Sequence, residues 1–350
     1  MKKKNVLVIF GGMSNEYEVS LKSAAAAIEN MDLSKYNLMM LGITQEGKWL
    51  RFFGDVEMIR NHTWLTDKSC VEAFISPSRE QKGLIELSPE GYKVTEVDVV
   101  FPILHGKFGE DGTIQGLLEL SGIPFVGCRT LASAICMDKA ITHRLVAKEG
   151  IKVARSIVLY KEDRNAEQRL EEVDIKLPVY IKPAKSGSSI GITKVFHFEQ
   201  LEDAISKAFL EDDKVVIEEN INGFEVGCAI LGNENPMIGE VDEIELMGDF
   251  FDFNEKYMLA NSKIHMPARV EKEVAHQIKK TAIKIYEILS CTGLARVDMF
   301  LTQGNEIYFN EVNTLPGFTS SSRYPKMMSS IGLSYTDVIT RLIELALEEV

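Results

Sequence analysis

Two short stretches of the sequence decide the fold: Leu294-Ala-Arg-Val-Asp-Met-Phe-Leu301 and Ile307-Tyr-Phe-Asn-Glu-Val-Asn313. Each is apolar enough to form a buried β-strand, and each carries two polar side chains that are two positions apart. Side chains at positions i and i+2 of a strand point to the same face of the sheet. If the two strands are neighbours, the polar pairs therefore converge on one patch, made of Arg296, Asp298, Glu311 and Asn313.

This patch has the chemistry of a magnesium site. Two carboxylates and an amide oxygen are hard ligands, and Mg²⁺ commonly takes few protein oxygens and completes its octahedron with phosphate and water. A surface salt bridge is the alternative, but apolar residues flank both polar pairs. Because a buried charge is costly unless a metal or ligand neutralises it, we predict that Mg²⁺ binds to Asp298, Glu311 and Asn313.

A second stretch, Ile181-Lys-Pro-Ala-Lys-Ser-Gly-Ser-Ser-Ile-Gly191, has the composition of an anion-binding loop. A strand would deliver Lys182, and the small residues after it would let backbone N–H groups fold around phosphate oxygens. A flexible solvent loop is the alternative. Together with the predicted magnesium ligands, the stretch favours a site for a phosphate-bearing ligand.

The remaining sequence indicates an α/β domain followed by two α+β domains. At about 150 residues per domain, the 350 residues allow two or three domains. Apolar runs alternate with helical segments from the N-terminus, which predicts an open parallel sheet within residues 1–126. Residues 127–222 and 223–350 form the two α+β domains. We expect strands at 5–10, 38–43, 97–102, 155–160, 179–182, 225–231, 294–301 and 307–311, and helices at 20–29, 198–210, 271–289 and 334–347.

Composition excludes several classes of protein. The chain has 52 acidic and 39 basic residues, and this negative balance argues against partners such as nucleic acid or an anionic membrane. No run approaches the roughly 18 uncharged apolar residues that a membrane span requires. The five cysteines are scattered, without C-x-x-C spacing. We therefore expect a cytoplasmic protein with reduced thiols.

Over essentially its whole length, the sequence resembles the D-alanine:D-alanine ligase family of the ATP-grasp superfamily. The resemblance rests on six ordered motif groups: Gly11-Gly12 with Glu18-Val19-Ser20, Leu104-His105-Gly106 with Gly109-Glu110-Asp111-Gly112-Thr113, Met137-Asp138-Lys139, Lys182-Pro183 with Gly187-Ser188-Ser189, Lys256-Tyr257, and Arg296-Val-Asp298 with Glu311-Val-Asn313-Thr-Leu-Pro316-Gly317-Phe-Thr319-Ser320. Within the family, Lys22 and the runs 186–189 and 316–325 look most like the glycopeptide-resistance ligases of D-alanine:D-serine type.

The resemblance implies an ATP-grasp fold, in which the two α+β domains sandwich ATP. It implies that ATP phosphorylates the carboxylate of D-alanine, and that a second D-amino acid attacks the acylphosphate to form a dipeptide for peptidoglycan precursors. By subgroup, it implies vancomycin resistance. A homodimer through the N-terminal domain is also expected. The alternatives are a housekeeping D-alanine:D-alanine ligase, another ATP-grasp carboxylate-amine ligase, and a non-catalytic nucleotide-binding protein.

The resemblance also implies which residues form the site. The catalytic group is Glu18, Ser188, Tyr257 and Arg296. The ATP contacts are Lys139, Lys182, Glu218, Glu225, Phe250, Lys256 and Phe300. The substrate contacts are Glu18, His105, Arg296, Ser322 and Arg323. The metal ligands are Asp298, Glu311 and Asn313, which would bind two Mg²⁺ ions that Mn²⁺ can replace.

Particular roles follow for some of these residues. Glu18 is expected to anchor the ammonium group of the first D-alanine and to share a hydrogen-bonded group with Ser188 and Tyr257. Arg296 would hold the oxyanion of the tetrahedral intermediate. Arg323 would bind the carboxylate of the second substrate bidentately. Because Tyr257 is the aromatic residue of the peptide-forming members, we expect negligible use of D-lactate. Because Lys22 and Arg323 set the sequence apart from the housekeeping D-alanine enzymes, we expect D-serine as the preferred second substrate and D-alanine as a lesser one.

Overall fold

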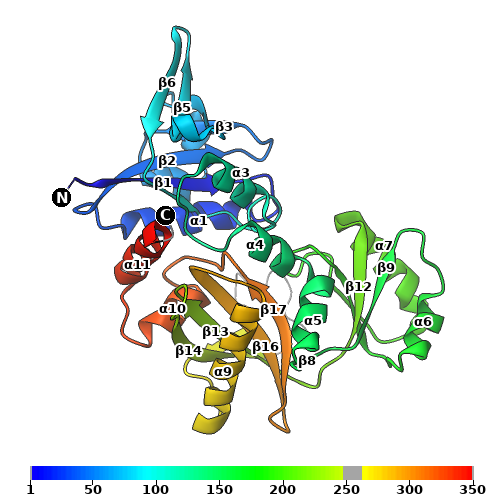
Figure 1. Cartoon of the computed structure of the whole chain (residues 1–350). Coiled ribbons are helices and arrows are strands. Elements are labelled where there is room, and N and C mark those ends of the chain that lie inside the picture. The colour runs from blue at the N-terminus through cyan, green and yellow to red at the C-terminus, as the bar shows by residue number, and fades with distance from the viewer. Residues whose placement is uncertain (1, 247–261, 349–350) are drawn as a thin grey trace.

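The computed structural model of the chain describes residues 2–246 and 262–348. Its strands form three sheets of seven, four and six strands. Figure 1 shows the seven-stranded sheet above the six-stranded one, with the four-stranded sheet to one side. This mixed α/β architecture agrees with the predicted fold class. No helix in the described part of the chain is long and apolar enough to cross a membrane.

The N-terminal sheet has the strand order β6-β5-β4-β3-β2-β1-β7. Its strands are β1 (Lys4–Gly11), β2 (Tyr36–Ile43), β3 (Trp49–Phe52), β4 (Val71–Ile75), β5 (Gly83–Ser88), β6 (Gly91–Glu96) and β7 (Val99–Pro102). β1 runs parallel to β2 and β7, and its central residues are fully buried, as expected for a parallel strand covered on both faces. The predicted parallel sheet is thus one part of a mixed sheet, because β3 to β6 extend it with antiparallel strands.

Helix α1 is attached to the ends of the parallel strands. The helices of this region are α1 (Tyr17–Glu29), α2 (Val56–Arg60), α3 (Thr113–Ser121), and the short 3₁₀ helices η1 (Trp64–Thr66) and η2 (Arg79–Gln81). The buried hydroxyl of Ser20 accepts a hydrogen bond from the backbone N–H of Gly11 at 2.8 Å and donates one to the carbonyl of Ile103. These bonds fix the loop between β1 and α1 at the carboxyl edge of the parallel strands.

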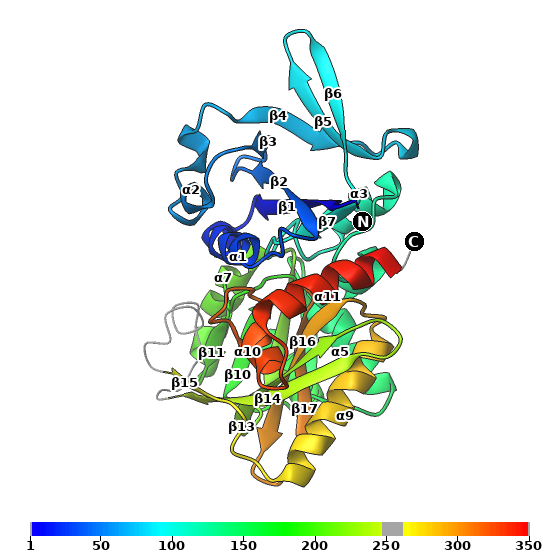
Figure 2. The same cartoon turned by 90° about the vertical axis from the view of Figure 1, so that its left-hand side faces the viewer.

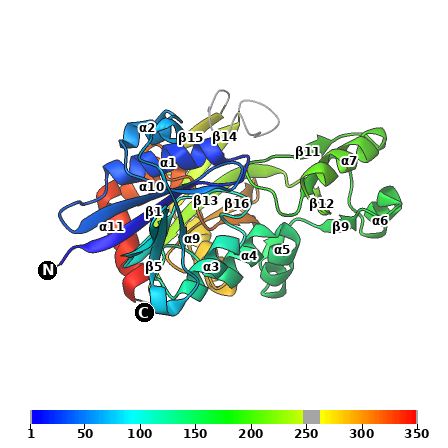
Figure 3. The same cartoon turned by 90° about the horizontal axis from the view of Figure 1, so that it is seen from above.

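The middle of the chain forms a small antiparallel sheet with the order β11-β10-β12-β9. Its elements are α4 (Thr130–Met137), α5 (Lys139–Lys148), β9 (Ser156–Tyr160), α6 (Ala166–Glu172), β10 (Val179–Pro183), β11 (Thr193–Val195), η3 (Phe198–Gln200), α7 (Leu201–Glu211) and β12 (Lys214–Glu219). Apolar side chains of the sheet pack against α6 and α7 in one buried cluster. Figure 3 shows this unit projecting away from the other two sheets.

The C-terminal sheet has the order β15-β14-β13-β16-β17-β8. Its elements are β8 (Lys152–Val153), β13 (Gly223–Leu231), β14 (Met237–Leu246), β15 (Ser262–His265), α9 (Lys272–Ile288), β16 (Leu294–Thr302), β17 (Ile307–Asn313), α10 (Arg323–Ser329) and α11 (Tyr335–Glu348). Helix α9 packs on one face, and α10 packs against β13 and β14.

Two elements make contacts across the proposed domain boundaries. β8 lies in the middle of the chain, yet it pairs in parallel with β17. Helix α11 shares a buried apolar cluster with β1 and α1, and Figure 2 shows it lying between the N-terminal and C-terminal sheets. The division into residues 1–126, 127–222 and 223–350 stays a proposal.

A buried ion pair joins the first residue of β12 to the start of α5. The ammonium group of Lys214 donates to both carboxylate oxygens of Asp138 at 2.7 Å. One of these oxygens also caps α5 by accepting from the N–H of Ile141 at 3.1 Å. Both side chains are buried, so loss of either partner leaves a charge without compensation.

We expect Lys214→Met to lower the free energy of unfolding by about 3 kcal/mol, because it strands the Asp138 carboxylate in the interior. The double variant Asp138→Asn/Lys214→Met should regain most of this loss, since no buried charge remains and asparagine still caps the helix. Urea unfolding followed by circular dichroism measures both. Equal urea midpoints for the single and double variants would show that the unpaired carboxylate of Asp138 is not the cause of the lost stability.

Candidate active site

β16 and β17 are antiparallel neighbours, as the sequence analysis assumed. Their register places Arg296 opposite Asn313 and Asp298 opposite Glu311. Side chains of directly opposed residues lie on the same face of a sheet. The predicted convergence of these polar side chains is therefore confirmed, and their alternating neighbours face the apolar cluster beneath α9.

Arg296 and Asp298 form a buried ion pair, with 4% and 1% of their surface exposed. Nε of Arg296 lies 2.8 Å from one carboxylate oxygen, and a terminal nitrogen lies 2.7 Å from the other. Burial by itself would lower the pKa of Arg296, but the charge of Asp298 outweighs burial, and the pKa is raised. Asn313 donates to the same carboxylate at 2.9 Å. A fixed positive charge thus lies beside the carboxylate that we expect to bind Mg²⁺.

Arg323, the first residue of α10, is buried and contacts three carboxylates. Asp242 accepts from its Nε at 2.7 Å and from one terminal nitrogen at 2.8 Å, and Glu225 accepts from the other terminal nitrogen at 2.7 Å. Asp298 lies 3.4 Å from the nitrogen that it shares with Asp242. The bidentate partner of Arg323 is therefore Asp242, which the sequence analysis did not single out. Contact of Arg323 with a substrate stays a prediction.

The carboxylates in this region outnumber the cations. Arg296, Arg323 and Lys139 are the cations, and Glu225, Asp242, Asp298 and Glu311 are the carboxylates. This excess of negative charge fits a divalent cation held by two carboxylates and an amide. No cluster of three or more His, Cys, Asp or Glu side chains suited to a metal occurs within residues 2–246 and 262–348. The expected ligand set includes the amide of Asn313 and stays a proposal.

Glu16, not Glu18, meets the loop that follows β10. The hydroxyl of Ser188 donates a hydrogen bond to the buried carboxylate of Glu16, whereas Glu18 is exposed. The predicted contact between Glu18 and Ser188 is therefore wrong. A Cβ atom at Gly187 would lie 2.9 Å from the same carboxylate, so the loop approaches it closely. The start of α1 at Tyr17 could have distinguished the two residues, because Glu18 then lies in the first turn of the helix, on its exposed side.

Two lysines face the candidate site from the middle of the chain. The ammonium group of Lys139 donates to the carbonyl of Ser186 at 2.7 Å and lies 3.7 Å from Glu311. Lys182 donates to Glu218 at 2.6 Å. Burial would raise the pKa of Glu218, but the neighbouring charge of Lys182 outweighs it and lowers the pKa. The pair is thus ionised, although both side chains are buried.

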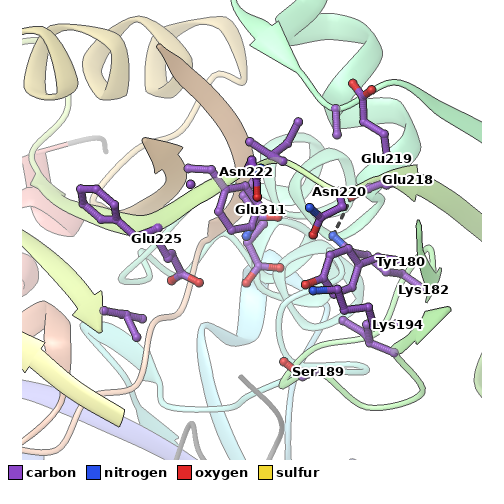
Figure 4. Close-up of a pocket in the computed structure, with 18 of the residues that line it drawn as sticks. Tyr180, Lys182, Ser189, Lys194, Glu218, Glu219, Asn220, Asn222, Glu225 and Glu311 are labelled. Atoms are coloured by element: carbon purple, nitrogen blue, oxygen red, sulfur yellow. Dashed lines mark hydrogen bonds and ion pairs between the residues drawn. The ribbon is translucent and has the colours of Figure 1, made fainter. Parts of the chain in front are cut away.

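A cavity of about 540 Å³ lies between the four-stranded and six-stranded sheets. Of the predicted residues, those that line it are Lys139, Lys182, Glu218, Glu225, Phe300 and Glu311. Figure 4 shows Glu225 and Glu311 on one side of the cavity and Lys182 with Tyr180 on the other. One oxygen of Glu218 is buried and accepts no hydrogen bond within the part of the chain that is described. This oxygen lies 3.8 Å from Nδ1 of His143.

The other predicted residues lie at the edge of this site or outside the described part. Phe250, Lys256 and Tyr257 fall within residues 247–261, which the structure does not describe. The ring nitrogens of His105 lie 3.0 Å from the carbonyl of Leu315 and 3.3 Å from the hydroxyl of Ser23. Ser322 precedes α10, and its hydroxyl accepts from the N–H of Thr319 at 3.0 Å. Contacts of these residues with substrate stay predictions.

The two sheets with a polar cavity between them define the class of protein: an ATP-grasp enzyme. Comparison with protein-family models agrees. The model for the D-ala D-ala ligase N-terminus matches residues 5–128, and the model for the D-ala D-ala ligase C-terminus matches residues 145–344. The chain belongs to the D-alanine–D-alanine ligase family, and its function is that of an ATP-dependent ligase of cell-wall synthesis.

Individual relatives span the whole chain. D-alanine–D-alanine ligase of Caldicellulosiruptor bescii is 46% identical, covering 100% of this chain and 96% of the relative. Vancomycin C-type resistance protein VanC1 of Enterococcus gallinarum is 45% identical, covering 99% of both. The solved VanG D-Ala:D-Ser ligase of Enterococcus faecalis is 49% identical, with a TM-score of 0.92 and coverage of 99% and 100%. D-alanine–D-alanine ligase of Bacillus anthracis complexed with ATP is 28% identical, with a TM-score of 0.74 and coverage of 99% and 98%.

We expect Glu16→Ala to loosen the loop of residues 185–191, because a hydrogen bond to a buried charge is lost at a cost of about 1.5–3 kcal/mol. Hydrogen–deuterium exchange of the backbone amides in this loop measures the effect. Glu18→Ala is the matched control, since its side chain is exposed, and it should leave the exchange unchanged. Faster exchange in the control, with none in Glu16→Ala, would restore the original assignment of Glu18.

Proposed function

We propose that this enzyme joins D-alanine to a second D-amino acid, preferably D-serine, through a D-alanyl phosphate. The observation that carries the proposal is the cross-strand patch of Arg296, Asp298, Glu311 and Asn313, whose Glu311 lines the same cavity as Lys139 and Lys182. Phosphoryl transfer chiefly requires positioning and neutralisation of charge, and this arrangement supplies both. Similarity to the VanG D-Ala:D-Ser ligase supports D-serine, and similarity to VanC1 supports the expected role in vancomycin resistance.

The nucleotide would lie in the cavity between the two sheets. One buried oxygen of Glu218 accepts no hydrogen bond from the described residues and lies 3.8 Å from Nδ1 of His143. As an acceptor it would suit the exocyclic amino group of adenine, whereas guanine would present a carbonyl oxygen there. Lys139 and Lys182 are placed to bind phosphate oxygens, and Lys256 is proposed to join them. Glu225 and Phe300 line the cavity near the C-terminal sheet and would contact ribose and adenine.

Asp298, Glu311 and Asn313 would hold Mg²⁺, which supplies neutralisation of the phosphate charge. Arg296 carries a guanidinium that ion pairing holds in place, so it needs no reorganisation to stabilise an oxyanion. Glu16 takes over the role first given to Glu18: its buried carboxylate would hold the ammonium group of the first D-alanine. The bond between Glu16 and Ser188 closes the loop over that site and would exclude water.

The second substrate would lie near Ser322 and Arg323. D-serine differs from D-alanine by one hydroxyl, and a pocket selects for it strongly only when it provides a hydrogen-bond partner that D-alanine leaves unsatisfied. Arg323 and its partner Glu225, which lines the cavity, would provide this hydrogen-bond partner. A housekeeping D-alanine:D-alanine ligase is the alternative, and the 46% identity to the Caldicellulosiruptor bescii enzyme favours it.

We also propose that the enzyme acts in the cytoplasm as a homodimer formed through its N-terminal sheet. On one face of β4, β5 and β6, exposed apolar side chains occupy opposed positions of the three strands. They are Phe74, Leu87, Tyr92 and Val94. Apolar patches of this kind are typical of protein interfaces. A monomeric mass in light scattering would contradict the dimer.

Glu311→Gln should abolish turnover and leave the fold intact, because it removes a charge that holds Mg²⁺ and no core contact. Phosphate release over a titration of Mg²⁺ measures the effect. Glu306→Gln is the control: Glu306 lies just before the same strand, is exposed, and pairs with Lys152. Near-wild-type activity of Glu311→Gln at ordinary Mg²⁺ would refute the metal assignment.

The decisive experiment is ligation with ATP, D-alanine and equal concentrations of D-serine and D-lactate, with products resolved by mass. D-alanyl-D-serine should dominate, D-alanyl-D-alanine should be the lesser product, and D-alanyl-D-lactate should be negligible near neutral pH. A dominant D-alanyl-D-alanine peak would reject the D-serine preference. Absence of any dipeptide would reject ligation, whereas phosphate release that requires D-alanine would exclude a protein that merely binds nucleotide.

A further inference from the structure

Gly227 lies in the middle of the C-terminal sheet, between two buried carboxylates. In the register of the sheet it is opposite Asp242 on β14 and opposite Asp298 on β16. These two side chains are 0% and 1% exposed. Because directly opposed residues share a face, the two carboxylates flank the position where a side chain of residue 227 would stand.

The guanidinium of Arg323 occupies that position. A Cβ atom on Gly227 would lie 2.3 Å from a terminal nitrogen of Arg323, 2.7 Å from Asp242 and 3.0 Å from Asp298. The same nitrogen donates to Asp242 at 2.8 Å and lies 3.4 Å from Asp298. Because Gly227 has no side chain, the guanidinium can lie in this space between the two carboxylates.

The backbone gives no other reason for a glycine at this position. Gly227 is not among the glycines with positive φ, so any residue could adopt its conformation. Glycine weakens a strand, and in a strand interior it often marks the close approach of another group. The backbone N–H of Gly227 also donates to Asp242 at 3.0 Å, which holds that carboxylate beside Arg323.

We propose that Gly227 is a positioning residue for the second substrate: its lack of a side chain lets Arg323 bridge Asp242 and Asp298. The inference rests on the proposed role of Arg323 and extends it to a residue that contacts no ligand. A side chain at position 227 displaces the guanidinium from its place between Asp242 and Asp298. Selection of the second D-amino acid then fails, while Lys139, Lys182 and Glu218 of the proposed nucleotide site, which make their own contacts, keep their positions.

The first test compares Gly227→Ala with Gly239→Ala. Gly239 lies in the same sheet, and a Cβ atom there would meet Ala229, Met327 and Met328 at 3.1 Å, with no charged group among them. Gly227→Ala should raise KM for the second D-amino acid about tenfold, as expected for a displaced binding group, and reduce the share of D-alanyl-D-serine. KM for ATP should rise much less, because Glu225 is the one proposed nucleotide contact that pairs with Arg323 in the described residues. Gly239→Ala should lower the melting temperature without changing either KM or the product ratio.

The second test is a double-mutant cycle with Arg323→Ala. When the guanidinium is absent, Gly227→Ala still crowds Asp242 but has no guanidinium to displace, so it should add no further change to KM of the second amino acid. If Arg323→Ala does not fold, Arg323→Lys serves, because it lacks the terminal nitrogen above Gly227. Additive effects would overturn the proposal, as would an unchanged KM in Gly227→Ala.

The outcomes separate this proposal from the proposed function. A wild-type enzyme that makes mainly D-alanyl-D-alanine contradicts the D-serine preference, yet coupling between positions 227 and 323 in KM for D-alanine would still support the positioning role. If dipeptide forms but positions 227 and 323 are coupled only in melting temperature and not in KM of the second amino acid, Gly227 is a structural residue and the proposal is overturned.

Discussion

The antiparallel pairing of β16 with β17 is the constraint on which the site depends. It places Arg296 opposite Asn313 and Asp298 opposite Glu311, and a slip of β17 by one residue would turn Glu311 and Asn313 to the opposite face. The apolar residues between them fix the register, because they must remain in the cluster beneath α9. The hydrophobic pattern that stabilises the sheet therefore also sets the geometry of its polar groups.

Burying so many carboxylates requires cations at fixed positions. Asp298 pairs with Arg296, Asp242 with Arg323, and Glu218 with Lys182. An ionised carboxylate without such a partner would be very costly in the interior. Each pair also includes a residue with a role in the proposed reaction. The same contacts therefore neutralise the buried charges and keep the side chains of the site rigid.

The sequence predicted those parts of the molecule that have a local pattern. Alternating and continuous apolar runs located β1, β13, β16 and β17, and the spacing of two predicted the convergence on one patch. Three features were missed for physical reasons. β3 to β6 are short and partly exposed, so their pattern is weak. Glu16 was passed over because the choice between it and Glu18 depends on where α1 begins. Asp242 stands in Glu240-Val-Asp-Glu-Ile244, which alone resembles the solvated face of a strand; its partner Arg323 is far away in the sequence.

The position of α11 has a consequence for biogenesis. Its residues Val338, Ile339, Leu342 and Ile343 belong to the same buried cluster as Val6 and Val8 of the first strand. The N-terminal sheet therefore cannot complete its hydrophobic core until α11 has left the ribosome. During synthesis, the apolar surface of β1 and α1 that α11 later covers is open to solvent and to other nascent chains. A chaperone that shields apolar surface would find a target there.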